Sequence, residues 1–203
     1  MPLTRENFIN QYSEIHKKKR YGHTSKSLLH LLLPYIEEIE AKSILDYGCG
    51  QSSLIDELKD IFDPNDEGNI KTFRYDPAID GYAKLPEEKV DLVICTDVLE
   101  HIPCQDLDQV IEKILALGQQ AIFVIATKKA REILPDGSNA HCSVYNKYWW
   151  LDMIKQYAEF AKFTPWPVKG RCCIITWDSR AVGGKFDAIL KYIAGNANNL
   201  FKK

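Results

Sequence analysis

The 203-residue sequence lacks the features that identify several large classes of protein. Its longest apolar run, LLHLLLPYI, is far too short to span a bilayer, which takes about 20 residues. The first residues, MPLTRENFINQ, lack the charged and then apolar layout of a secretion signal. The formal net charge is only −2, so there is no overall electrostatic case for a nucleic-acid partner. These absences predict a soluble protein with no membrane partner.

The six cysteines form no C-x-x-C pair, and two of them are adjacent in a run that is typical of a buried strand. This excludes the usual zinc spacing and a secreted disulfide framework. No other constellation of metal-ligating residues stands out, so we assign no metal ligands, and the sequence leaves metal dependence open. Free cysteines in apolar runs act as small hydrophobes, which favours a reduced, cytoplasmic protein. The cysteines are Cys49, Cys95, Cys104, Cys142, Cys172 and Cys173.

What the sequence does contain is a regular alternation of apolar strand patterns and amphipathic helix patterns. The strands are predicted over 42–48, 70–76, 90–96 and 120–127, with helices over 52–62 and 106–118. Strands that alternate with helices imply a parallel sheet covered on both faces. We therefore expect one α/β domain, doubly wound, over residues 1–203.

Both ends of the chain carry further predicted elements. A polar amphipathic helix covers 5–21, and the next helix begins at Thr24, with Pro34 arguing for a kink or for two shorter helices. The second half continues with a polar, turn-rich segment over 128–146, a helix over 147–160, a strand pair over 162–168 and 171–177, and a last helix over 186–195.

Two glycines end the first strand, in the stretch SILDYGCGQSSL at residues 43–54. Gly48 and Gly50 have no Cβ, so a ligand could approach the backbone there, and the following helix offers free N–H groups. Simple turn chemistry explains such a pattern equally well. Acidic residues at the ends of neighbouring strands favour the ligand-binding explanation over simple turn chemistry.

Asp76 and Asp97 follow the second and third predicted strands, at the same edge of the sheet. A carboxylate such as Asp76 can accept hydrogen bonds from both hydroxyls of a ribose, although a solvated loop aspartate is the alternative. A dinucleotide fingerprint would need glycine at position 53, where the chain has Ser53. The pattern therefore favours a nucleoside ligand without a diphosphate.

The segments ILDYGCGQSSL, YDP and DLVICTDVLEHIP, in this order over about residues 40–127, resemble the class I S-adenosylmethionine-dependent methyltransferases. The resemblance implies a mostly parallel seven-stranded sheet with a reversed final strand. It also implies S-adenosylmethionine as cofactor and S-adenosylhomocysteine as product, with the methionine end over DYGCG and the ribose on Asp76. The candidate cofactor residues are Asp46, Tyr47, Gly48, Cys49, Gly50, Ser52, Asp76, Pro77, Tyr82, Leu85, Asp97, Val98 and His23.

The sequence departs from this family pattern in two places. Gln51 and Ser52 occupy the region where relatives usually have a third glycine. Only 14 residues, 77–90, separate Asp76 from the next strand's aspartate, so the third strand and its helix are shortened or lost. The adenine pocket would then come from AIDGYAKLP, with Tyr82 and Leu85 as its apolar walls. A loop tyrosine that packs on the core is equally consistent with the sequence.

Hydroxyl acceptors usually need a base, and two histidines are suitably placed. His101 lies just past the third strand, where a structural role is the alternative. His141 lies in the substrate-side loop over 128–146, which is long enough to act as a lid. An aromatic cluster at the end of this loop and just after it suggests a floor for sugar rings or bases, although one tryptophan should anchor its helix in the core. The cluster is Tyr145, Tyr148, Trp149 and Trp150.

Residues 1–23 form a second predicted cover, a lid at the N-terminal end. His23 in this segment is a candidate cofactor contact together with Tyr21 and Gly22, and a helix-capping histidine is the alternative. The basic run HKKKR at 16–20 is typical of a solvated helix end, or it contacts an anionic substrate.

The leading hypothesis is O-methylation of a small polar acceptor, a sugar or sugar-derived metabolite. The absence of D-P-P-Y or N-P-P-Y, where this chain has TDVL, disfavours methylation of adenine or cytosine amines. A nucleic-acid or protein methyltransferase that docks through the basic run is the first alternative. A non-catalytic, cofactor-binding interaction subunit is the second. The sequence leaves the oligomeric state open.

Overall fold

The computed structural model describes residues 4–18, 24–165 and 168–180. Within them, six strands form one sheet in the order β2-β1-β3-β4-β6-β5. The first four strands of this order run parallel, and β6 runs antiparallel to both of its neighbours. The strands are β1 (Ser43–Tyr47), β2 (Lys71–Tyr75), β3 (Val90–Thr96), β4 (Gly118–Ala126), β5 (Lys162–Phe163) and β6 (Arg171–Ile175).

This topology confirms the predicted doubly wound α/β fold but corrects its strand count from seven to six in the described residues. The connection from β2 to β3 holds only the single turn η1 (Asp80–Tyr82). Parallel neighbours need a crossover of a dozen or more residues, so this segment has no room for a crossover helix and another strand. The shortened third-strand region leaves β2 as the outer strand of the described sheet.

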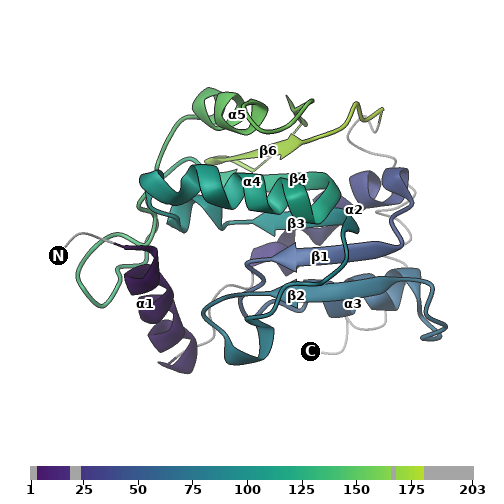
Figure 1. Ribbon diagram of the computed structural model, residues 1–203, viewed down its shortest axis with the longest axis horizontal. Coiled ribbons are helices and arrows are strands. Elements are labelled where there is room, and N and C mark those ends of the chain that lie inside the picture. The colour runs from purple at the N-terminus through teal and green to yellow at the C-terminus, as the bar shows by residue number, and fades with distance from the viewer. Residues whose placement is uncertain (1–3, 19–23, 166–167, 181–203) are drawn as a thin grey trace.

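Helices cover both faces of the sheet (Figure 1). Successive residues of a strand point to opposite faces, so Ile44 packs toward α2 and α3 and Leu45 packs toward α4 and α5. Because both faces are covered, the central strands β3 and β4 are mostly apolar, whereas the outer strand β2 is more polar. The helices are α2 (Thr24–Ile39), α3 (Leu54–Phe62), α4 (Leu107–Leu117) and α5 (Lys147–Lys155).

Pro34 lies inside α2, which is assigned as one helix from Thr24 to Ile39 rather than as two shorter ones. Its apolar face is fully buried against the sheet, which holds the helix together around the proline. The predicted helix over 147–160 is shorter, since α5 ends at Lys155. The predicted last helix over 186–195 lies outside the described residues.

The N-terminal helix α1 (Arg5–Lys18) lies beyond the carboxyl ends of the parallel strands, beside the 128–146 loop (Figure 1). Phe8 and Ile15 of α1 form a small buried cluster with Leu134 and Ala140 of that loop. Two short turns, η2 (Leu99–His101) and η3 (Cys104–Asp106), follow β3 at the same edge. No helix among the described residues is both long enough and apolar enough to cross a membrane.

Candidate active site

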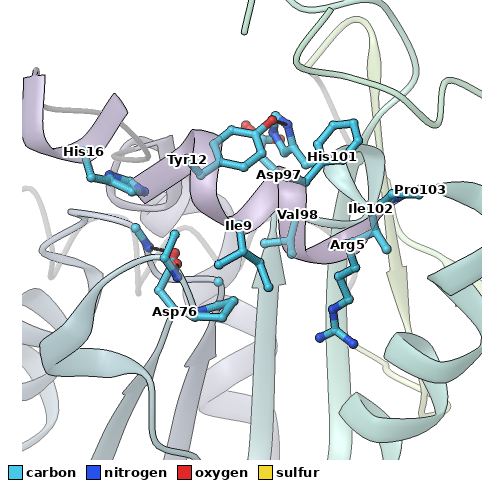
Figure 2. A pocket seen from close by; sticks show the side chains of 15 residues that line it. Arg5, Ile9, Tyr12, His16, Asp76, Asp97, Val98, His101, Ile102 and Pro103 are labelled. Carbon is cyan, nitrogen blue, oxygen red and sulfur yellow. Dashed lines mark hydrogen bonds between the residues drawn. The ribbon is translucent and has the colours of Figure 1, made fainter. Parts of the chain in front are cut away.

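A pocket lies under α1 where the carboxyl ends of β1, β2 and β3 meet (Figure 2). The strand order reverses at β1, because β2 follows on one side and β3 on the other. Ligands of doubly wound sheets bind at this switch point, outside the carboxyl ends of the strands. Seven of the predicted site residues line the pocket: Gly48, Gly50, Asp76, Pro77, Asp97, Val98 and His101.

The glycine turn after β1 is shaped first by contacts within the protein. Gly48 has a φ of +74°, and a Cβ there would lie 2.4 Å from Cγ2 of Val98. The amides of Gly48 and Cys49 both donate to the carbonyl of Tyr75, at 2.7 and 3.0 Å. The fold itself therefore requires glycine at position 48, because the Val98 side chain packs against the backbone there.

Asp76 is buried, and two backbone amides hold its carboxylate in place. Oδ2 accepts from the amide of Gly50 at 2.9 Å, and Oδ1 accepts from the amide of Ala78 at 2.9 Å. Each carboxylate oxygen has a second lone pair. Asp76 thus joins the ends of β1 and β2 and can still accept hydrogen bonds from a ligand in the pocket.

Four other candidate cofactor residues lie beneath the pocket and do not line it: Asp46, Tyr47, Cys49 and Ser52. The Ser52 hydroxyl accepts from the amide of Leu54 at 3.1 Å, which satisfies one free amide at the start of α3. Burial raises the pKa of Tyr47 and of Cys49. These buried residues therefore support the glycine turn from the side of the protein core.

Asp46 is the most unusual member of this buried group. It is 1% exposed, and neither carboxylate oxygen has a hydrogen-bond partner among the described residues. Burial raises the pKa of Asp46 to about 7, with Arg74 opposing the shift and Asp76 adding to it. A carboxyl group with this pKa changes its charge in the physiological range.

Asp97 comes directly after β3 and has a φ of +53°, in the left-handed region. Its carboxylate accepts from Nε and Nη2 of Arg171, both at 2.7 Å. Such bidentate pairs fix the side-chain geometry as well as the charge. The reversed strand β6, which carries Arg171, therefore orients an aspartate at the edge of the pocket.

His101 ends η2 and lines the pocket on the other side of Val98 from Asp76 (Figure 2). Its Nδ1 lies 2.8 Å from the carbonyl oxygen of Ala140 and 2.7 Å from the hydroxyl of Tyr12. Burial, together with the nearby His141, lowers the pKa of His101 to about 4. The ring is neutral at physiological pH, but it is a weak base for a hydroxyl group.

His141 lies next to His101 and to the buried Glu100, so the two predicted catalytic histidines occupy one place. The two rings meet edge to face with centroids 4.7 Å apart. Glu100 Oε1 accepts from the amide of Ala126 at 2.9 Å and lies 4.0 Å from His141 Nε2. Burial raises the pKa of Glu100 well above its ordinary value, and Asp97 adds to the shift.

Tyr82 and Leu85 do not line this pocket. The guanidinium group of Arg74 lies over the Tyr82 ring, 5.6 Å from its centroid, and Leu85 packs against the core on the α4 side of the sheet. Their role as walls of an adenine site stays a prediction. His23 lies outside the described residues, as do Tyr21 and Gly22.

The predicted aromatic floor lies elsewhere, because none of its four residues lines the pocket. Trp150 is fully buried in the core, as expected for one of the two tryptophans. Trp149 stacks on Tyr145 with centroids 3.7 Å apart, and Tyr148 is 63% exposed. Adjacent helix positions face different directions, so one helix could not present all of these rings to the pocket.

Sequence reasoning missed the pocket residues contributed by α1, which are Arg5, Phe8, Ile9, Tyr12 and His16. Ile9 points from α1 toward Val98 in Figure 2. The amphipathic pattern identified a covering helix but not which of its side chains face the pocket. The sequence also gave no signal for the pairing of Arg171 with Asp97 or for Glu100 as a neighbour of His141.

Comparisons with known proteins identify the family and the fold. A family model described as "Methyltransferase domain" matches residues 16–176, and no curated protein sequence matches the chain. The structure of DhpI with SAH is 12% identical, with 87% of this chain and 100% of that chain covered and a TM-score of 0.53. Human N-acetylserotonin methyltransferase with SAM is 11% identical, with 86% and 56% covered and a TM-score of 0.55.

The small RNA methyltransferase HEN1 is 19% identical, with 76% of this chain and 25% of that chain covered and a TM-score of 0.55. The chain thus spans only part of HEN1 and of the human enzyme, and at these identities the likeness concerns the fold. The family model, by contrast, matches well over half of the sequence. The chain belongs to the methyltransferase domain family, which confirms the class of S-adenosylmethionine-dependent methyltransferase predicted from its motifs.

Proposed function

We propose that this protein transfers the methyl group of S-adenosylmethionine to a hydroxyl group of a small acceptor bound under α1. The observation that best supports the proposal is one pocket that joins Gly50 and Asp76 to His101. Methyl transfer from a sulfonium is an in-line displacement, so the protein must hold donor and acceptor end to end. A pocket that runs from a ribose-binding carboxylate to a neutral imidazole suits that requirement.

On the cofactor side, Asp76 accepts the ribose hydroxyls while its two backbone bonds keep the carboxylate in place. The methionine end lies over the Gly48–Gly50 turn, and Val98 borders the sulfonium. Asp46 and Tyr47 support the turn from beneath the pocket. A charged hydrogen bond contributes about 1.5–3 kcal/mol, so Asp76 carries much of the cofactor's affinity.

On the acceptor side, the lining is mostly apolar, with Phe8 and Ile9 from α1 and Ile102 directly after η2. Polar side chains there include Asp97 and His101, with Arg5 and Tyr12 from α1. This favours a small acceptor with an apolar body and one hydroxyl group near His101. A sugar hydroxyl, the acceptor favoured from the sequence, is the more polar candidate.

The alternative of a macromolecular acceptor has less support. HEN1 and the human enzyme carry different acceptors in their names, so the shared fold does not choose between them. Of the basic run at 16–20, His16 lines the pocket, while Lys17 and Lys18 are exposed at the end of α1. Exposed lysines in the last turn of a helix are typical of a solvated helix end.

Calorimetry with S-adenosylhomocysteine tests the cofactor half of the proposal. Asp76→Asn presents an NH₂ group to one of the two backbone amides and removes the charge, so we expect at least tenfold weaker binding. Asp80→Asn, an exposed change in the same connection, is the matched control and should bind like the wild type. Equal affinity in the two variants would exclude Asp76 from the cofactor site.

Release of S-adenosylhomocysteine over a panel of acceptors tests the other half. The panel contains phenols, aliphatic alcohols, free sugars, sugar phosphates and short RNA, each measured at low and at high salt. We expect turnover with small hydroxyl compounds and little dependence on salt. Turnover with RNA alone, falling steeply as salt rises, would instead identify a nucleic-acid methyltransferase.

A further inference from the structure

Glu100, His101 and His141 form a cluster beside the acceptor end of the pocket. Each offers one potential ligand atom, and these atoms all lie within 4.8 Å of one another. Glu100 and His101 are neighbours in η2, whereas His141 comes from the 128–146 loop. Two distant parts of the chain thus bring a carboxylate and two imidazoles together.

Both imidazoles are oriented by a backbone carbonyl. His101 Nδ1 lies 2.8 Å from the Ala140 oxygen, and His141 Nδ1 lies 2.5 Å from the Lys128 oxygen. A carbonyl oxygen can only accept, and the Tyr12 hydroxyl near His101 Nδ1 donates to the same Ala140 oxygen. These contacts assign the proton to Nδ1 in each ring and leave a lone pair on Nε2. Histidines that bind metals show this same second hydrogen bond, which fixes the tautomer and the ring orientation.

Glu100 adds an acceptor that the protein does not satisfy. The side chain is fully buried, Oε1 accepts from the amide of Ala126, and Oε2 has no hydrogen-bond partner among the described residues. Buried polar groups usually have partners, and each exception needs an explanation. Here one carboxyl group and two imidazoles lie together, and one carboxyl oxygen has no partner among the described residues.

We propose that Glu100, His101 and His141 bind one divalent first-row transition-metal ion. Magnesium and calcium prefer all-oxygen sites, whereas imidazole suits zinc, iron, cobalt and related ions. Three protein ligands leave at least one coordination position open. Asp97 is not in the ligand set, because Arg171 occupies both of its oxygens.

The spacing also predicts how the site changes on binding. Metal–ligand distances of about 2.0–2.2 Å place neighbouring ligand atoms roughly 3–3.5 Å apart. The present spread of 4.8 Å is larger, so binding must draw the ligands together. Glu100 and His101 are held beside β3, so we expect the movement in the 128–146 loop, which carries His141.

The role of the ion rests on the proposed function, although its binding does not. His101 lines the pocket, so the open coordination position faces the acceptor hydroxyl. A bound ion lowers the pKa of that hydroxyl, whose proton leaves to solvent. The oxygen electron pair then forms the bond to the methyl carbon, and the sulfur–carbon bond breaks with its pair remaining on sulfur. Deprotonation of the acceptor hydroxyl would then not depend on His101 acting as a strong base.

Cobalt binding tests the site without any measurement of turnover. Chelator-treated protein is titrated with Co²⁺ and followed by visible absorption, which reports the ligand field. We expect one equivalent bound by the wild type, and at least tenfold weaker binding by Glu100→Gln and by His141→Ala. His30→Ala is the matched control, since His30 is exposed on α2. It should bind like the wild type.

Affinity for S-adenosylhomocysteine confirms that each variant is folded, and if Glu100→Gln does not fold, His141→Ala decides the question. No cobalt bands, or equal affinity in His141→Ala and His30→Ala, would refute the site. Cobalt binding without methylation of any acceptor keeps the site but refutes the proposed function. Unchanged turnover in excess chelator refutes the catalytic role alone.

Discussion

Gly48→Ala is the sharpest test of how the glycine turn is built. Two separate effects should destabilise the variant. An alanine at a φ of +74° occupies the left-handed region, which costs about 1–2 kcal/mol. Its Cβ would also lie 2.4 Å from Val98 Cγ2 and 3.0 Å from Cγ1, so Val98 or the turn must move. Overpacking of this kind typically costs about 1–3 kcal/mol.

Gly68 is the matched control, because the structure separates the two effects. It has a φ of +76°, and an added Cβ would meet nothing within 4 Å. Gly68→Ala should therefore lose only the conformational part, about 1–2 kcal/mol. The difference between the two variants measures the overlap with Val98, and we expect about 1–3 kcal/mol.

Urea unfolding followed by circular dichroism gives these differences. The double variant Gly48→Ala with Val98→Ala removes the overlap but not the strained φ. We expect its stability loss to fall short of the sum of the two single losses by about 1 kcal/mol or more. If the losses simply add, and Gly48→Ala equals Gly68→Ala, the contact with Val98 does not explain the glycine.

Three other changes test separate contacts. Arg171→Gln leaves Asp97 without its bidentate partner in a partly buried place, and urea unfolding should show a loss on the order of 2 kcal/mol; no loss would mean that the pair is dispensable. Asp46→Asn removes a carboxyl whose pKa is raised to about 7 by burial. The folded wild type keeps that proton between about pH 4 and 7, so its stability falls as pH rises through this range, and the variant should lack that slope in thermal melts from pH 4 to 8. Phe8→Ala removes packing against Leu134, so amide hydrogen exchange in α1 should become faster while exchange in β3 stays unchanged. If exchange in α1 were the same in the variant and the wild type, packing against the 128–146 loop would not be what stabilises this helix.

The sequence predicts the sheet well because each central strand is buried on both sides. Runs such as VDLVICT at 90–96 have no other place in a small domain, and β3 covers the predicted range. Parallel strands then place all their carboxyl ends at one edge. This is why the sequence alone predicts that Gly48, Asp76 and Asp97 share one site, and all three line the pocket.

The remaining parts of the site depend on chain paths that local patterns do not encode. The 128–146 loop has no periodicity, so nothing in the sequence placed His141 beside Glu100. The arginine that pairs with Asp97 comes from the reversed strand β6, and only the register of β6 on β4 places it there. The same holds for the aromatic cluster, in which Trp150 is fully buried while Tyr148 is exposed, because the order of these residues does not show which of them face the core.

The missing third strand changes how the molecule must protect its surface. β2 pairs only with β1 among the described residues, so its far side presents unpaired backbone groups. Such a border can pair with another chain and start aggregation. The strand is only five residues long, and it carries Lys71 and Arg74, which pair with Glu88 and Asp56. Brevity and charge are two ways in which natural sheets discourage that association, so neutralising Lys71 should make the protein less soluble before it makes it less active.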